Sequence, residues 1–218
     1  MRRALLIVVA VAAVTAGSAA PAQKAQLTIY AAASLTNVFP QIDKGQRYSF
    51  GGSNTLAAQI QQGAPADVFA SANMTLPAGL YAKKLCSKPV VFTRNTLVIA
   101  GPGVPVGSYT LQMLKNMNLS AKVLPNVVSR ETDVREVLAK VALGEADAGF
   151  VYATDAKVDA GKVKVLKVPA WAQPKVQYGI CVVSSSTHKA DARKFVNKVI
   201  SKTGQAKLRA AGFLPRKK

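Results

Sequence analysis

The sequence holds few of the residues that bind metals or act as nucleophiles. Its 218 residues include one histidine, His188, and two cysteines, Cys86 and Cys181. Structural zinc sites take four ligands, and these three residues do not make a convincing set. A serine nucleophile needs a neighbouring base, and the lone histidine stands in a different sequence context from Ser34 and Ser53. We therefore expect a protein without a cofactor that is not an enzyme. An exported serine hydrolase that uses Ser34 or Ser53 is the rival interpretation.

Acidic residues and aromatic residues are also scarce. Ten Asp and Glu face 29 Lys and Arg, which gives a formal net charge of +19, and aromatics make up 6% of the chain. Such a charge is common in proteins that bind nucleic acid or anionic surfaces. The lysines, however, are scattered and have no interleaved aromatics for base stacking. We expect a solvated basic surface and no nucleic-acid partner, with a basic surface-interaction protein as the alternative.

Long apolar runs are absent beyond the N-terminus. Arg2 and Arg3 precede an apolar run over residues 4–16, and small residues follow it. This layout is typical of a secretory signal, and the run is shorter than the roughly 20 residues of a membrane-spanning helix. We expect residues 1–22 to be a signal peptide. The protein would then reside in the periplasm or at the outer face of the cytoplasmic membrane, and a retained anchor is the alternative.

The two cysteines leave their own pairing open. Cys86 and Cys181 are far apart in the sequence, and in an oxidising compartment a single even pair suggests one disulfide. Two unpaired buried thiols fit the sequence equally well.

Positive charge is missing around two similar motifs. No Lys or Arg occurs in residues 48–82, and Ser34 lies in a second such window between Lys24 and Lys44. The runs AAASLTN and FGGSNTLA each follow a predicted strand, contain a serine and open a helix. Unpaired N–H groups and the dipole at a helix start attract anions, although either serine could also be an ordinary N-cap. A site built only from neutral donors accepts a fully deprotonated tetrahedral dianion, whereas hydrogen phosphate would need an acceptor.

Strand-like and helix-like segments alternate along the chain. This alternation predicts an α/β architecture with parallel sheets. In the run DVREVLAKVALG, Asp133 is predicted to be the N-cap of a helix and Glu136 to complete a capping box. The run KVKVLKVP, residues 162–169, has a period of two and predicts a half-exposed strand.

Five motifs in this order resemble those of the molybdate-binding proteins of bacterial ABC importers: AAASLTNVF, GSNTLAAQIQQGAPADVFASA, VPVGSY, DVREVL and AGFVYATDA. The resemblance runs from about Gln26 to Pro215 and implies a two-lobed periplasmic-binding-protein type II fold. Such a protein closes on molybdate or tungstate between its lobes and delivers it to a membrane permease driven by a cytoplasmic ATPase. The resemblance also implies a monomer. A relative that binds another oxyanion, such as sulfate, is the alternative.

The resemblance also carries over the ligand-binding residues. From the first lobe, Ser34 and Ser53 would donate hydrogen bonds, and Ala72 would line the same side. From the second lobe, Val106 and Val134 would offer backbone N–H groups at helix starts. Tyr152 would donate its phenol. All contacts to the metal would then run through the oxyanion, without direct metal ligands.

One departure from the family pattern concerns the middle of the chain. In the family, a strand like NTLVIA is followed by a crossover helix and another strand. Here Ala100 is followed directly by GPGVPVGSY, so about one βα unit, roughly 30 residues, is missing. We expect the first lobe to comprise residues 24–98 and 178–218, and a shortened second lobe to comprise residues 99–177.

Overall fold

A computed structural model describes residues 25–95, 97–98 and 105–216. The predicted signal peptide and the junction after Ala100 lie outside the described residues. The strands are β1 (Thr28–Ala32), β2 (Arg47–Gly51), β3 (Val68–Ser71), β4 (Val90–Arg94), β5 (Leu97–Val98), β6 (Val151–Tyr152) and β7 (Gln177–Val182). The α-helices are α1 (Phe39–Ile42), α2 (Ser53–Gln61), α3 (Thr75–Ala82), α4 (Pro105–Asn116), α5 (Ser120–Val123), α6 (Val134–Ala142), α7 (Ala153–Ala156), α8 (Lys189–Ile200) and α9 (Lys202–Ala210). Three short 3-10 helices complete the list: η1 (Ala33–Leu35), η2 (Leu124–Asn126) and η3 (Ala170–Ala172).

The main sheet has five strands in the order β2-β1-β3-β7-β4. Strand β1 pairs in parallel with β2 and with β3, so that Ala32 lies opposite Gly51 and Ala31 opposite Ala70. The carboxyl ends of these three strands therefore reach the same edge of the sheet. Strand β7 runs antiparallel to β3 and to β4, and Arg94 of β4 lies opposite Gln177.

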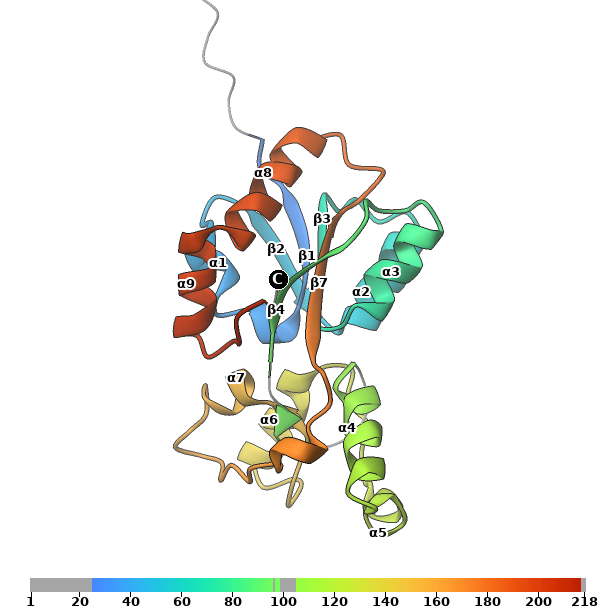
Figure 1. Cartoon of the computed structure of the whole chain (residues 1–218), viewed down its shortest axis with the longest axis vertical. Helices are drawn as coiled ribbons and strands as arrows, with labels where there is room; N and C mark the ends of the chain where they lie inside the picture. Colours follow the sequence, from blue (N-terminus) through green and yellow to red (C-terminus); the bar gives the residue numbers. More distant parts are fainter. Residues whose placement is uncertain (1–24, 96, 99–104, 217–218) are drawn as a thin grey trace, which may run out of the picture.

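Helices cover both faces of this sheet. In Figure 1, α2 and α3 lie on one side of the strands, and α1, α8 and α9 lie on the other. Two apolar clusters fill the spaces between them. The larger includes a group of aromatic rings centred on Phe39 and Phe92, and the smaller joins Leu56, Phe69 and Leu80 beneath α2 and α3. The pattern of strand and helix seen in the sequence thus produces a three-layered arrangement.

A second group of elements lies below the main sheet in Figure 1. It consists of the two-stranded sheet β5-β6 and helices α4 to α7. We call the part with the five-stranded sheet the upper part and this group the lower part, as they appear in Figure 1. Among the residues described, no helix combines the length and apolar character needed to cross a membrane.

Three sequence predictions are corrected or refined by the structure. The α/β class is confirmed, but the main sheet is mixed rather than parallel, because β7 runs against both of its neighbours. The run at residues 162–169 forms no strand within the described chain, and Val165 and Leu166 are half exposed there. Asp133 caps α6 as predicted, yet Glu136 accepts from the N–H of Thr132 and not from that of the N-cap residue itself.

Candidate functional site

The six residues predicted as ligand-binding lie together around one small cavity. Ser34 belongs to η1, which follows β1, and Ser53 opens α2, which follows β2. Ala72 comes directly after β3. The parallel pairing of these strands brings all three residues to the same sheet edge. The structure thus joins segments that lie up to 38 positions apart in the sequence (72 − 34).

The lower part supplies the opposite wall. Val106 lies in the first turn of α4, Val134 is the first residue of α6, and Tyr152 ends β6. The cavity is therefore formed between the upper and lower parts. Six further described residues line the cavity and were not among the predicted ligand-binding residues: Ala32, Ala33, Gly51, Gly52, Pro105 and Asp133.

The cavity is small and its walls carry little charge. The space open to the centre of a water molecule is about 10 Å³, which suits a single water. No Lys or Arg is among the described residues that line it, and Asp133 is the one ionisable group besides Tyr152 in that set. The Asp133 carboxylate accepts hydrogen bonds from the N–H groups of Arg135 and Glu136 at 2.7 and 3.2 Å. These contacts commit one of its oxygens to capping α6.

The two serines are held by hydrogen bonds that set their chemistry. Ser53 Oγ accepts a hydrogen bond from the N–H of Ala72 at 3.1 Å, so its own proton remains available. Ser34 Oγ lies 2.9 Å from the hydroxyl of Tyr178, and either oxygen can be the donor. Both serines are almost fully buried. Each can therefore act as a neutral donor into the cavity, provided that its proton points there.

The helix starts in the lower part add backbone donors. The first N–H groups of a helix have no acceptor within it. At α6, Asp133 takes the N–H groups of Arg135 and Glu136, and no described residue accepts from the N–H of Val134. The dipole of this nine-residue helix adds a partial positive charge at the same end.

The hydroxyl of Tyr152 is the least satisfied polar group in the site. Its side chain is 1% exposed, and its oxygen has no hydrogen-bond partner among the described residues. Burial above all raises the pKa of this phenol well above its usual value, and the nearby ionisable groups Tyr178, Tyr109 and Asp155 raise it further. Tyr152 therefore stays protonated and is a donor without an acceptor, which is costly in a buried place.

A buried carboxylate supports Tyr152 from behind. Asp155 is fully buried; its Oδ1 accepts from Arg135 Nε at 2.8 Å and its Oδ2 accepts from the N–H of Tyr152 at 3.3 Å. Burial raises the pKa of Asp155 to about 6, while the Arg135 guanidinium opposes that rise. Arg135 follows the cavity residue Val134 in the sequence. Its positive charge is balanced by Asp155 in this ion pair.

The upper and lower parts approach each other closely at one glycine. A Cβ placed on Gly52 would lie 2.2 Å from the carbonyl oxygen of Thr132. Gly52 precedes α2 and Thr132 precedes the N-cap of α6, so the two helix starts face each other across the cavity edge. Only a residue without a side chain permits this approach. The glycine was visible in the sequence, but its close approach to Thr132 could not be predicted from it.

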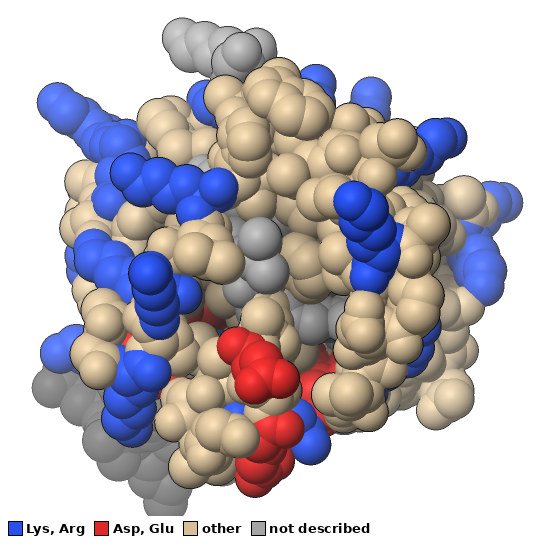
Figure 2. Space-filling view, turned by 90° about the horizontal axis from the view of Figure 1, so that it is seen from below, with Lys and Arg blue, Asp and Glu red and all other residues tan. Residues whose placement is uncertain are grey.

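The structure also shows where the residues lie on which the alternative interpretations depend. His188 is exposed at the start of α8 and does not line the cavity that contains Ser34 and Ser53. Cys86 and Cys181 are buried free thiols in one apolar cluster. Figure 2, a view from below, shows Lys and Arg spread around that face and several Asp and Glu gathered near its middle. On this face the basic side chains form no continuous stripe.

Comparisons with known proteins show which family this chain resembles. The family of bacterial extracellular solute-binding proteins matches residues 14–104 and 101–214. A protein of Mycobacterium tuberculosis, "Molybdate-binding protein ModA", is 34% identical over 231 residues, covering 89% of this chain and 87% of its own length. The corresponding protein of Haemophilus influenzae is 32% identical, covering 88% of this chain and 91% of its own length.

Solved structures show the same fold. The periplasmic molybdate-binding protein of Azotobacter vinelandii superposes with a TM-score of 0.79 at 21% identity, covering 88% of this chain and all of the other. The sulfate-binding protein SubI of Mycobacterium tuberculosis gives a TM-score of 0.74 at 20% identity, covering 87% and 86%. At these identities the likeness establishes the fold. From the family match and the ModA relatives together, this chain belongs to the bacterial extracellular solute-binding proteins, within the family of the ModA proteins.

Proposed function

We propose that this protein captures a tetrahedral oxyanion, molybdate or tungstate, in the cavity between its upper and lower parts. It would then deliver the ion to a membrane permease driven by a cytoplasmic ATPase. The observation that carries this proposal is the hydroxyl of Tyr152, a protonated donor that is buried beside the cavity and has no hydrogen-bond partner among the described residues. An ion with only acceptor oxygens satisfies this group and the donors opposite it.

The donor set fits such an ion in kind. Ser34 and Ser53 approach from the upper part, and the N–H groups of Val106 and Val134 from the lower part. Because none of the described lining residues is a cation, a bound ion would be recognised by hydrogen bonds whose directions are fixed. A fully deprotonated dianion can accept all of them. Hydrogen phosphate carries one proton that would meet another donor, at a cost of roughly 1–3 kcal/mol.

The size of the cavity favours an inorganic ion. A space suited to one water accepts a four-oxygen ion only when the upper and lower parts separate slightly, and it has no room for an organic solute. Sulfate is smaller than molybdate and fully deprotonated at neutral pH, so it is the alternative ligand. The ModA relatives favour molybdate.

We further propose that the upper and lower parts are the two lobes of the binding protein. The first lobe would comprise residues 24–98 and 178–218 and the second residues 99–177, except that β5 (Leu97–Val98) pairs with β6 in the lower part and would belong to the second lobe. The arrangement in Figure 1 supports this division, since the chain passes to the lower part after β4 and returns with β7. Closure of the lobes on the ion would give the permease a liganded form to recognise.

Two observations support the proposal that the second lobe is shortened. The two family matches meet at residues 101–104, and the alignment with the M. tuberculosis relative is longer than this whole chain, at 231 against 218 residues. A cavity of about 610 Å³ between α4 and α6 is lined largely by apolar side chains, including Met113, Met117 and Phe150. An absent βα unit accounts for such an uncovered surface.

The remaining features of the proposal concern location and chemistry. Residues 1–22 would direct export and be removed, which leaves a monomer in the periplasm or at the outer face of the cytoplasmic membrane. The protein would need no cofactor and carry out no covalent reaction. The exposed His188, which does not line the cavity, supports this against the serine-hydrolase alternative.

Calorimetry with the mature protein tests the proposal. Molybdate, tungstate, sulfate and phosphate are titrated in turn into the wild type, Ser34→Ala and Ser53→Ala. We expect heat with molybdate and tungstate, and each substitution should weaken binding by about 1–3 kcal/mol, the usual loss for a hydrogen bond to a charged partner. Sulfate binding alone would support the alternative ligand. Absence of heat with all four ions would refute the proposal.

A further inference from the structure

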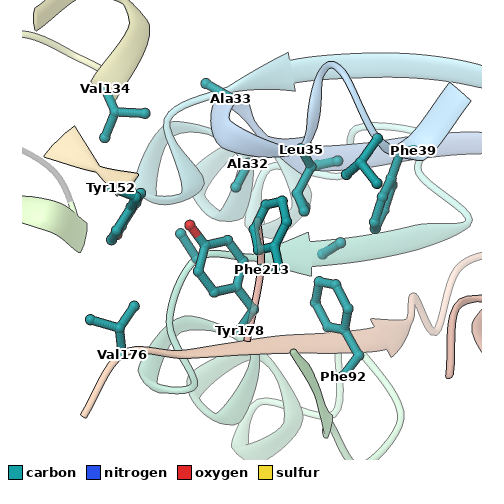
Figure 3. Packing of buried hydrophobic residues seen from close by; sticks show 14 of the residues in the cluster. Ala32, Ala33, Leu35, Phe39, Phe92, Val134, Tyr152, Val176, Tyr178 and Phe213 are labelled. Carbon is teal, nitrogen blue, oxygen red and sulfur yellow. The ribbon is translucent and has the colours of Figure 1, made fainter. Parts of the chain in front are cut away.

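A chain of buried polar side chains reaches Ser34 from outside the cavity. Tyr178, on β7, is 0% exposed, and its hydroxyl lies 2.9 Å from Ser34 Oγ. Asn95, just after β4, donates from Nδ2 to the Tyr178 hydroxyl at 3.4 Å and to Thr154 Oγ1 at 2.8 Å. Figure 3 shows the Tyr178 ring extending from β7 toward Tyr152 and Ala32. Neither Tyr178 nor Asn95 lines the cavity.

The protons along this chain can be assigned from the chemistry of each group. The amide nitrogen of Asn95 is only a donor, and its two contacts use both of its protons. The oxygen of Tyr178 therefore accepts from Asn95 and keeps its own proton for Ser34. Burial, the largest influence, raises the pKa of Tyr178 well above its usual value, so the phenol remains protonated. Ser34 Oγ then accepts from Tyr178, and the serine proton is free to point into the cavity.

We propose that Tyr178, oriented by Asn95, is a positioning residue that fixes Ser34 as a hydrogen-bond donor to the bound ion. This inference rests on the proposed function, because it concerns how the same cavity recognises an oxyanion. It also assigns a specificity role to two residues outside the cavity. In the opposite orientation Ser34 would donate to Tyr178 and could accept the proton of hydrogen phosphate. The Tyr178 proton would then point toward the Asn95 amide, which is itself a donor. The chain therefore favours fully deprotonated ions.

A double-mutant cycle tests the positioning role. Molybdate affinity is measured by calorimetry for the wild type, Tyr178→Phe, Ser34→Ala and the double variant. The ring of Phe preserves the edge-on contacts of Tyr178 with Phe92, Tyr152 and Phe213. We expect Tyr178→Phe to weaken binding about tenfold, as for a lost hydrogen bond in a charged site. In the Ser34→Ala background the same change should have no further effect, because the group that it orients is already gone.

A matched control separates this role from the general loss of a phenol hydroxyl. Tyr48 lies in the same part of the molecule, and its hydroxyl donates to the carbonyl oxygens of Phe39 and Asp43. Tyr48→Phe should leave molybdate affinity unchanged. A purely structural role for Tyr178 predicts the same fold-loss in both Ser34 backgrounds, and that result would overturn the proposal.

A second variant reverses the direction of the chain. Asn95→Asp replaces the Nδ2 donor by a carboxylate oxygen, which can accept the proton of Tyr178. Ser34 should then donate to Tyr178 and present an acceptor to the cavity. We expect the ratio of molybdate to hydrogen phosphate affinity to fall at least tenfold; an unchanged ratio contradicts the proposal. If the wild type binds molybdate but these variants behave otherwise, the positioning role fails alone. If the wild type binds no oxyanion, the proposed function itself fails.

Discussion

Removing the hydroxyl of Tyr152 should shift stability and affinity in opposite directions. Without ligand this oxygen is buried and has no partner in the part of the chain that the structure describes, and such a group costs about 1–3 kcal/mol. Tyr152→Phe deletes the group and keeps the ring against Tyr178. We therefore expect the free energy of unfolding without ligand to stay constant or to rise by up to that amount. The melting temperature would follow by about 2–4 °C per kcal/mol for a chain of this size.

With the ion bound, the same hydroxyl gains its acceptor. A hydrogen bond to a charged partner contributes about 1.5–3 kcal/mol, so Tyr152→Phe should weaken molybdate binding by about 10- to 150-fold. Urea unfolding followed by circular dichroism measures the first effect, and calorimetry measures the second. Binding stabilises the folded state by mass action, so molybdate should raise the melting temperature of the wild type more than that of the variant.

Tyr48→Phe provides the contrast. The hydroxyl of Tyr48 donates to the carbonyl oxygens of Asp43 and Phe39 at 2.6 and 3.2 Å, away from the cavity. Its loss should lower the free energy of unfolding by about 1 kcal/mol and leave affinity unchanged. If Tyr152→Phe destabilised the ligand-free protein as much as Tyr48→Phe, the Tyr152 hydroxyl would already be satisfied without ligand. Tyr152 would then not be the central donor to the bound ion.

Three further predictions follow from other contacts. Gly52→Ala places a methyl group against the Thr132 carbonyl, so calorimetry should show weaker molybdate binding, and small-angle scattering with molybdate should show a less compact molecule. Asp155 has a folded-state pKa of about 6 against 3.8 in the unfolded chain, so the folded state holds its proton more tightly. Urea unfolding of the wild type relative to Asp155→Asn should therefore show stability falling by about 3 kcal/mol from about pH 4 to about pH 7; an unchanged difference would contradict this. Cys86 forms an isolated β-bridge with Val183, two residues from Cys181, and both thiols are buried in the same apolar cluster. Refolding in a glutathione redox buffer should join them and add about 2–4 kcal/mol of stability, which non-reducing mass spectrometry and unfolding would detect.

The sequence predicted the local elements of the site better than their long-range partners. The strand–serine–helix pattern placed Ser34 and Ser53 correctly because strand ends and helix starts are encoded over a few residues. Asp133 was identifiable as an N-cap for the same reason. The cavity as a whole depended on the resemblance, since no local rule relates Tyr152 to Ser34 across more than a hundred positions.

The features that the sequence did not predict depend on contacts between distant segments. The antiparallel direction of β7 follows from its return from the lower part, which is a property of the chain path and not of the residues Gln177–Val182. The run at residues 162–169 alternates in polarity, but within the described chain it forms no strand, and only Lys167 there takes part in a β-bridge. Alternation in polarity alone does not make a strand. Tyr178 was hidden because a tyrosine in a buried strand looks like any core aromatic until its hydroxyl is seen beside Ser34.

The pairing of Arg94 with Gln177 has a mechanical consequence. Two covalent connections join the upper and lower parts, and this pairing makes them leave the sheet side by side. Two adjacent connections of this kind form a hinge. They resist sliding and twisting of the lower part relative to the upper part, but they allow the two parts to rotate about a shared axis. Asn95 and Tyr178 are the next residues after Arg94 and Gln177. The rotation between the two parts and the orientation of the Ser34 hydroxyl are therefore set at the same place in the molecule.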